Sequence, residues 1–140
     1  MRVVLDTSIL VAAARSKKGT SFALVSTIPS PQYQICLSVG LYCEWLSVLQ
    51  RPNNIPIDLT VEDVHGFLRF LASQAHLQNI SFLWRPFLSD SNDDMILELA
   101  VAARCPYILT HNVKDFAGSD QFGVQALTPR KFLETLNNPS

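Results

Sequence analysis

An uninterrupted apolar run, Val3 to Leu5, followed at once by Asp6, Thr7 and Ser8, constrains this chain more than any other stretch. Three adjacent apolar residues without polar alternation are typical of a strand that is buried on both faces, as in a parallel sheet. Asp6 would then lie at the carboxyl edge of the sheet, where open α/β proteins bind their ligands. Asp6 is therefore either a functional carboxylate or simply the cap of a turn.

Strand and helix signals alternate along the rest of the chain. Further strands are expected at 33–37, 80–84, 107–109 and 124–127, and helices at 20–28, 38–49, 60–75, 93–103 and 128–136. The first of these helices is expected to be capped by Thr20 or Ser21, and the fourth to begin at Asp93 or Asp94. This alternation predicts one domain over 1–140, a three-layer α/β/α sandwich with a central, mainly parallel sheet.

Composition indicates the class of protein, a globular domain, but not its function. Apolar residues make up 48% and charged residues 16% of the 140, which is typical of a globular protein with a large interior. Cys36, Cys43 and Cys105 are odd in number and show no metal-ligand spacing, so we expect buried free thiols in a reducing compartment. Neither a signal peptide nor a membrane span is recognisable, so we expect a cytoplasmic protein without a membrane partner.

Four carboxylates occur at equivalent places in this layout. Asp6 ends the first strand, Glu44 lies in the helix after the second, Asp93 begins the buried helix, and Asp115 follows the fourth strand. All strands of a parallel sheet point one way, so these acids can converge on one cleft. Like charges gathered there stay ionised together only if a cation neutralises them. Carboxylate oxygens predict a hard cation, Mg²⁺ or Mn²⁺.

Helix phase separates the neighbouring acids of segment 93–103. Asp93 shares a face with the apolar residues three, four and seven positions later, so it is expected to point inward over the sheet edge. Asp94 is turned away by about a quarter of a circle and is kept as the reserve ligand. Asp90 is expected on a surface loop, and Glu98 is expected to be a solvated or interface charge.

Basic and histidine side chains near these acids leave alternatives open. Arg15, Lys17 and Lys18 either contact phosphates near Asp6 or form a solvated loop. His111 is interpreted as an exposed loop residue beside the site.

Four motifs in this order, VVLDTSIL, LYCEWLSVLQRP, DSNDDMILELA and ILTHNVKDF, resemble the PIN-domain family. The closest resemblance is to the single-domain toxin components of toxin–antitoxin systems. It covers almost the whole chain, including the TPRKFL segment near the end. The resemblance implies a Mg²⁺- or Mn²⁺-dependent ribonuclease, an RNA substrate, a cognate antitoxin and a homodimer.

The family motifs transfer residue by residue. Asp6 and Glu44 match the first two acids, the pattern D-x-x-I-x-x-x-A gives Asp93, and the pattern T-x-N-x-x-D-F gives Asp115. The family often carries Asn two residues after the first acid, where this chain has Ser8, whose hydroxyl can still bond a carboxylate. The side chains expected to order waters or ligands around the acids are Thr7, Ser8, Thr110 and Asn112.

We therefore expect an endoribonuclease in which a metal-activated water attacks single-stranded or structured RNA, acting as the toxin of a toxin–antitoxin pair. One alternative is a phosphotransfer enzyme with Asp6 as nucleophile, since haloacid dehalogenase phosphatases also begin with an Asp after a first strand. Those enzymes usually place a second Asp where Ser8 stands here. The other alternative is a non-catalytic interaction module that retains the fold.

The helix expected at 60–75 is apolar over more width than one packed face requires. Its apolar residues are Val64, Phe67, Leu68, Phe70 and Leu71. Exposed apolar patches commonly mark interfaces, so this helix is the expected dimer surface. The alternative is that Phe70 folds back on the core of a monomer.

Overall fold

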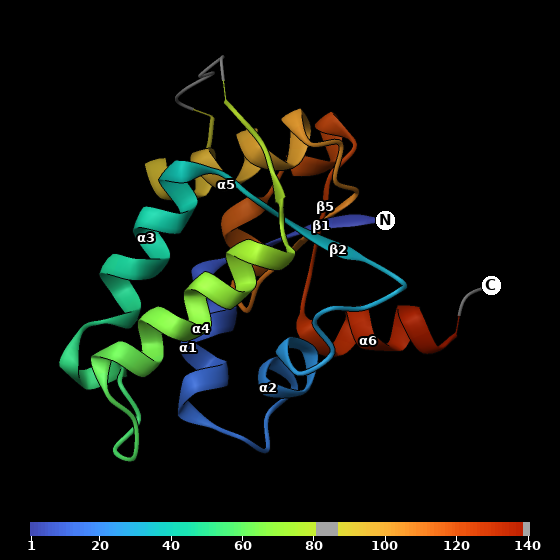
Figure 1. The fold of residues 1–140 in the computed structure, drawn as a ribbon. Helices are drawn as coiled ribbons and strands as arrows, with labels where there is room; N and C mark the ends of the chain where they lie inside the picture. The colour runs from blue at the N-terminus through green and yellow to red at the C-terminus, as the bar shows by residue number, and fades with distance from the viewer. Residues whose placement is uncertain (81–86, 139–140) are drawn as a thin grey trace.

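Parallel strands form the centre of the structure, a computed structural model that describes residues 1–80 and 87–138. Within these residues the sheet has five strands in the order β3-β2-β1-β4-β5, all parallel to their neighbours (Figure 1). The strands are β1 (Arg2–Leu5), β2 (Gln34–Leu37), β3 (His76–Leu77), β4 (Tyr107–Leu109) and β5 (Gln125–Leu127).

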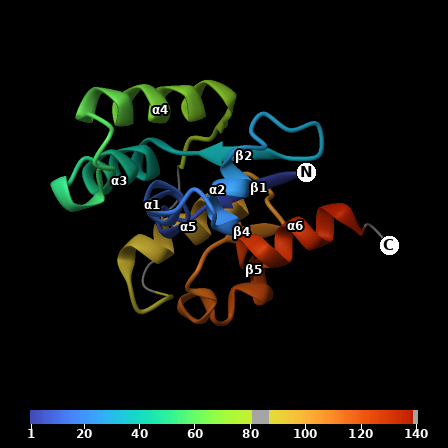
Figure 2. The same ribbon diagram turned by 90° about the horizontal axis from the view of Figure 1, so that it is seen from below.

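Helices connect and flank these strands, as the two perpendicular views show (Figures 1 and 2). The α-helices are α1 (Thr7–Arg15), α2 (Thr20–Val25), α3 (Val39–Leu49), α4 (Val61–Gln74), α5 (Ser91–Ala102) and α6 (Pro129–Asn137). Short 3₁₀ turns are η1 (Pro52–Asn54), η2 (Val113–Phe116) and η3 (Ser119–Phe122). The predicted α/β/α sandwich is confirmed. None of the described helices is long and apolar enough to cross a membrane.

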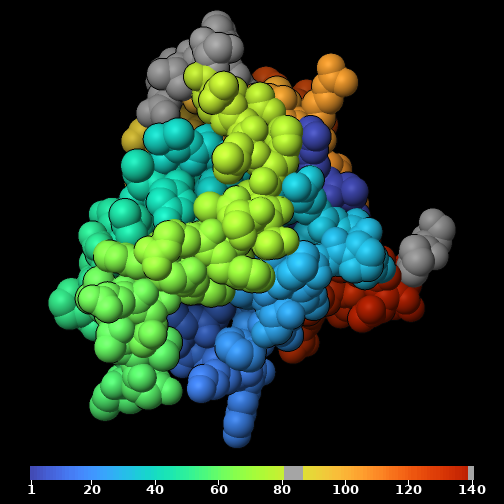
Figure 3. Space-filling view, in the orientation of Figure 1, coloured from blue at the N-terminus to red at the C-terminus, as the bar shows by residue number. Residues whose placement is uncertain are grey.

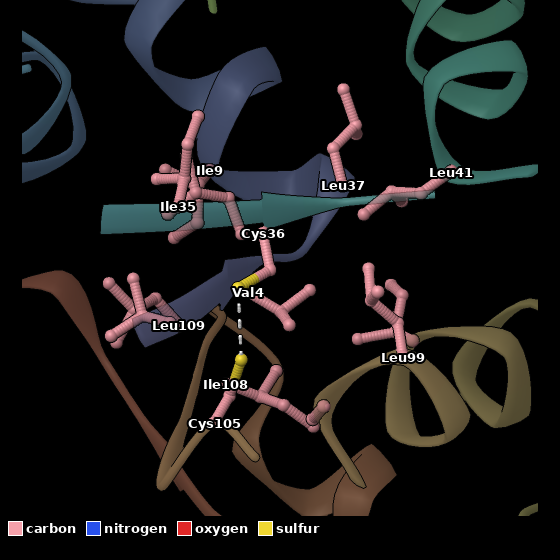
Figure 4. Packing of buried hydrophobic residues seen from close by; sticks show 14 of the residues in the cluster. Val4, Ile9, Ile35, Cys36, Leu37, Leu41, Leu99, Cys105, Ile108 and Leu109 are labelled. Atoms are coloured by element: carbon pink, nitrogen blue, oxygen red, sulfur yellow. Dashed lines mark hydrogen bonds between the residues drawn. The ribbon is translucent and has the colours of Figure 1, made fainter. Parts of the chain in front are cut away.

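Strand β1 is the centre of the sheet because it is apolar on both faces. Val3, Val4 and Leu5 are fully buried, with β2 on one side and β4 on the other. Val4 and its neighbours pack against side chains of β2, β4 and α5 (Figure 4). The sequence prediction for this strand is confirmed, and it leaves Asp6 at the carboxyl edge.

Polar side chains fix the helix starts that position the site. Ser38 accepts a hydrogen bond from the Leu41 N–H at the start of α3, as predicted. Thr60 and Asp63 form a reciprocal capping box on α4. Helix α4 then crosses the molecular surface (Figure 3).

Two helix starts differ from the prediction. Gly19, not Thr20 or Ser21, is the N-cap of α2, and that helix ends at Val25. Helix α5 begins at Ser91 because the Asp90 carboxylate accepts a hydrogen bond from an N–H of its first turn. The prediction that Asp93 or Asp94 opens this helix was wrong.

The third strand also differs from the prediction. It was expected at 80–84, but Ile80 lies outside any strand and residues 81–84 lie outside the described residues. Strand β3 is His76–Leu77, which pairs with Cys36 and Leu37 at the edge of the sheet. A two-residue edge strand carries no apolar run and therefore leaves no sequence signal.

Two thiols meet in the core. Cys105 donates a hydrogen bond to the sulfur of Cys36, with the two Sγ atoms 3.3 Å apart (Figure 4). Both side chains are buried, whereas Cys43 is exposed. The expectation of buried free thiols therefore holds for two of the three cysteines.

Candidate active site

Asp6 lies at the end of β1 and at the N-cap of α1, where its side chain is 8% exposed. Its Oδ2 accepts hydrogen bonds from Ser8 Oγ at 2.8 Å and from Thr110 Oγ1 at 2.7 Å. No described residue donates a hydrogen bond to Oδ1. The two hydroxyls therefore fix the carboxylate by one oxygen and leave the other available.

The loop after β4 holds these hydroxyls in place. The backbone N–H of His111 donates to Ser8 Oγ at 3.2 Å, and that of Asn112 donates to Thr110 Oγ1 at 2.9 Å. Ser8 and Thr110 thus contact Asp6 directly, as expected for side chains that order the site. Asn112 contributes its backbone to this network, and its side chain is exposed.

Glu44 reaches the same edge from α3. Thr7, next to Asp6 in the chain, donates a hydrogen bond to Glu44 Oε2 at 2.6 Å. Burial raises the pKa of the half-buried Glu44, the bond from Thr7 lowers it, and the charges of Asp6 and Asp90 raise it further. Glu44 therefore shares an electrostatic environment with Asp6.

Asp93 is the acid most strongly perturbed by its neighbours. Its pKa is raised from 3.8 to about 7, first by burial and then by the negative charges of Asp6, Asp90, Asp115 and Glu44. The charges of the other three acids chosen from the sequence thus all act on Asp93. Asp115 lies exposed on η2, at the outer side of the group. We call these four residues the acidic quartet.

Three further acids lie differently from what the sequence indicated. Asp90 is exposed, as expected, but it also caps α5 and its charge acts on Asp93 and Glu44. Asp94 is 2% exposed and accepts a 2.8 Å hydrogen bond from the Leu88 N–H, so it holds the preceding segment. Glu98 is also 2% exposed, so the expectation of a solvated charge was wrong.

The donor set of the acidic quartet suits a hard cation in its chemistry. Every side-chain donor is a carboxylate oxygen, and Asp6 Oδ1 is available. Within residues 1–80 and 87–138, however, no three His, Cys, Asp or Glu side chains already stand close enough to form a metal site. Mutually repelling carboxylates are expected to stand apart, and a cation would have to draw them together.

Comparison with known proteins places this geometry in a family. A model described as PIN domain matches residues 2–114, which contain three complete motifs and most of the fourth. The chain belongs to the PIN-domain family.

The fold of this PIN domain is also similar to a solved structure, the 2.2 Å resolution structure of VapBC-1 from nontypeable Haemophilus influenzae. The match has a TM-score of 0.62 at 17% identity and covers 93% of this chain and 99% of that one. A search of curated proteins found no match.

Two of the basic residues that follow Asp6 in this PIN domain have partners away from the acidic quartet. Arg15 lies at the far end of α1, roughly 13 Å along the helix from Asp6, and donates to Asn54 Oδ1. Lys17 pairs with Asp58 at 3.9 Å. Arg15 and Lys17 therefore fit the alternative of a solvated loop rather than that of phosphate contacts near Asp6.

Two other cations approach the acidic quartet, and the sequence interpretation missed both. The charge of Arg51 lowers the pKa of Glu44, as the smallest of the causes that act on that acid. Lys114 precedes Asp115 and lines the same pocket as Asp93. The available sequence signals were that Arg51 lies just beyond the end of the helix that carries Glu44 and that Lys114 lies next to Asp115.

His111 is an exposed loop residue beside the quartet, as interpreted from the sequence. Its Nε2 forms a hydrogen bond with Ser21 Oγ, and Ser21 is buried at the start of α2. This contact joins α2 to the loop that supports Asp6.

Proposed function

We propose that this PIN domain is a metal-dependent endoribonuclease whose active site is the acidic quartet. The observation that carries the proposal is the environment of Asp93, whose pKa is raised to about 7 first by burial and then by the charges of Asp6, Asp90, Asp115 and Glu44. Strongly perturbed carboxylates at the ligand-binding edge of an α/β sheet indicate a functional site more often than a structural one.

The chain's own residues divide into ligands and supports. Asp6, Glu44, Asp93 and Asp115 would hold Mg²⁺ or Mn²⁺, with Asp94 excluded because its carboxylate is engaged by the 87–88 backbone. The bound cation would orient the scissile phosphate and lower the pKa of the attacking water. Thr110 and Ser8 keep Asp6 Oδ1 turned to the site by binding Oδ2, and Thr7 does the same for Glu44.

Cleavage of single-stranded RNA by the purified protein tests this function. We expect cleavage with Mn²⁺ or Mg²⁺, none with excess chelator, and a loss of at least a hundredfold in Asp6→Asn. Asp120→Asn is the matched control, because Asp120 is an exposed acid of η3 outside the quartet. Intact RNA at every metal concentration and pH, or undiminished cleavage by Asp6→Asn, would refute the proposal.

The cleaved ends report the nucleophile. If water attacks the phosphorus, the products carry no 2′,3′-cyclic phosphate, and a single 2′-deoxy substitution at the scissile nucleotide leaves cleavage intact. Cyclic phosphate ends would instead identify the 2′-hydroxyl as the nucleophile and contradict this mechanism. The same assay excludes contamination by ribonucleases that need no metal.

We further propose that the chain is a cytoplasmic toxin with a cognate antitoxin. A groove of about 260 Å³ between α1, α2 and α4 is lined largely by apolar side chains, among them Phe22 and Phe67. Such a groove suits an apolar segment of a protein partner. Co-expression of the neighbouring small reading frame is expected to yield a stable complex that suppresses RNA cleavage. A neighbouring product that neither binds nor inhibits would oppose this assignment.

A homodimer through α4 is the remaining proposal. Val64, Leu68 and Leu71 pack into the core, but Phe70 stays 43% exposed rather than folding inward. Light scattering over a concentration series should give twice the chain mass of 15.6 kDa, and Phe70→Glu should shift it toward the monomer. A mass near 15.6 kDa at all concentrations would exclude the dimer.

A further inference from the structure

A second pocket adjoins the acidic quartet. It has a volume of about 270 Å³, and its lining includes Asp90, Asp93, Asp115, Phe87 and Lys114. We call it the Phe87 pocket. It combines an aromatic ring, a free cation and a direct border with the quartet, and the proposed reaction as described so far uses none of its non-acidic residues.

The Phe87 ring is supported at its edge and is 39% exposed. It meets Phe122 edge-to-face, with ring centroids 5.0 Å apart at 83°. A Cβ on Gly118 would lie 3.2 Å from Phe87 Cζ, and Gly118 has a φ of +93°, so glycine permits both the backbone conformation and the close approach of the ring. The ring is therefore a fixed apolar platform.

Asp94 makes the wall of this pocket rigid. Its buried carboxylate accepts hydrogen bonds from the Leu88 N–H at 2.8 Å and from the Phe87 N–H at 3.3 Å. Two backbone donors on one buried carboxylate hold the 87–88 segment against the first turn of α5. Phe87 thereby keeps a fixed position relative to Asp93, which directly precedes Asp94 in α5.

Lys114 supplies the positive charge of the pocket. Its side chain is exposed, and within the described residues its ammonium forms no ion pair. A phosphate beside the quartet would therefore find a cation that no protein carboxylate already neutralises.

We propose that the Phe87 pocket binds one unpaired nucleobase of the substrate, stacked on Phe87, next to the phosphate that is cleaved. Aromatic platforms beside cations are the usual means of binding single-stranded nucleic acid. A base in a continuous duplex cannot enter, because it would first have to leave its stack. The inference rests on the proposed ribonuclease function and narrows its substrate to RNA that is unpaired at the cleavage site.

Binding in an inactive background tests this pocket without relying on cleavage. Short single-stranded RNAs, each with 2-aminopurine at one position, are titrated into Asp6→Asn protein with Mn²⁺. We expect fluorescence quenching at one position, and a loss of affinity of roughly 5- to 100-fold when Phe87→Ala is added. Phe87→Leu, which keeps apolar bulk without a π face, should lose affinity too, and Phe87→Tyr should retain it.

The control is Ile57→Ala, which removes an exposed apolar side chain that lies outside both the acidic quartet and the Phe87 pocket. Unchanged affinity and quenching in both Phe87→Ala and Phe87→Leu would overturn the pocket, and so would equal binding of blunt duplex RNA. Failure of the pocket and failure of the function are distinguishable. If the wild type cleaves RNA and the Phe87 variants bind it unchanged, only the proposal for the pocket is refuted. If quenching is position-specific but the wild type does not cleave RNA, only the proposed nuclease function is refuted.

Discussion

Asp93 and Asp94 are adjacent in the first turn of α5, yet their carboxylates belong to different structures. Asp93 is half-buried near the other quartet acids. Burial raises its pKa most, and the charges of those acids raise it further. Asp94 is buried and accepts backbone hydrogen bonds from residues 87 and 88. The roughly 100° between consecutive helical residues produces this separation. Asp93 therefore belongs to the acidic quartet, and Asp94 holds the backbone segment beside it.

This division predicts opposite effects on stability. Asp94→Ala leaves two backbone N–H groups without their acceptor, one of them on the buried Leu88, and should cost about 1–3 kcal/mol of unfolding free energy. Asp93→Ala removes a charge that its neighbours repel and should not destabilise the metal-free protein. Urea unfolding at neutral pH compares the two. Equal destabilisation by both variants would contradict the assignment.

The raised pKa of Asp93 predicts how stability changes with pH. The folded chain holds this proton up to about pH 7, whereas the unfolded chain releases it near 3.8. The stabilisation is therefore complete below about pH 3.8 and is lost as the pH rises to about 7. Without metal, Asp93→Asn should match the wild type at the acid end and exceed its melting temperature above pH 7. A constant difference across this range would show that the pKa of Asp93 is not raised in the folded chain.

Thr110→Val tests the support of Asp6. The variant keeps the shape of a fully buried side chain but removes the 2.7 Å bond to Oδ2. Loss of a partner that orients a metal ligand typically weakens metal affinity 10- to 100-fold. Calorimetric titration with Mn²⁺ should show a loss of about this size. Thr135→Val is the control, because Thr135 bonds only within α6. Unaltered Mn²⁺ affinity in Thr110→Val would contradict the proposal that Thr110 orients Asp6.

Arg51 and Lys114 predict the electrostatic part of RNA binding. Each is expected to contact a phosphate, so Arg51→Ala or Lys114→Ala should weaken binding of all sequences alike and lower its salt dependence. Arg15→Ala should leave RNA affinity unchanged, because Arg15 bonds Asn54 at the opposite end of α1. Fluorescence anisotropy at several salt concentrations measures both. A larger loss of RNA affinity in Arg15→Ala than in Arg51→Ala and Lys114→Ala would contradict the assignment of phosphate contacts to Arg51 and Lys114.

The sequence was sufficient for features set by local chemistry. The apolar run before Asp6 predicted a buried strand, which the structure has, and Ser38 and Thr128 cap the predicted helices because their side chains accept hydrogen bonds from first-turn N–H groups. Helix phase also separated Asp93 from Asp94.

Features that depend on tertiary contacts could not be predicted from the sequence. Strand β3 exists because His76 and Leu77 pair with β2, not because of any pattern of their own. Glu98 is buried because α5 packs on the sheet at that turn. Arg15 was misplaced because the extent of α1, which carries it away from Asp6, was not predicted.

Titration of Mn²⁺ into the wild type and Asp6→Asn tests the account most directly. At pH 8 the solution is above the pKa of about 7 that Asp93 has without metal, so Asp93 is mostly ionised and can bind a cation. We predict saturable binding to the wild type and at least a tenfold weaker isotherm for Asp6→Asn, with Asp120→Asn unchanged. Absence of binding to the wild type, or superimposable isotherms for wild type and Asp6→Asn, would contradict the claim that the acidic quartet is a metal centre.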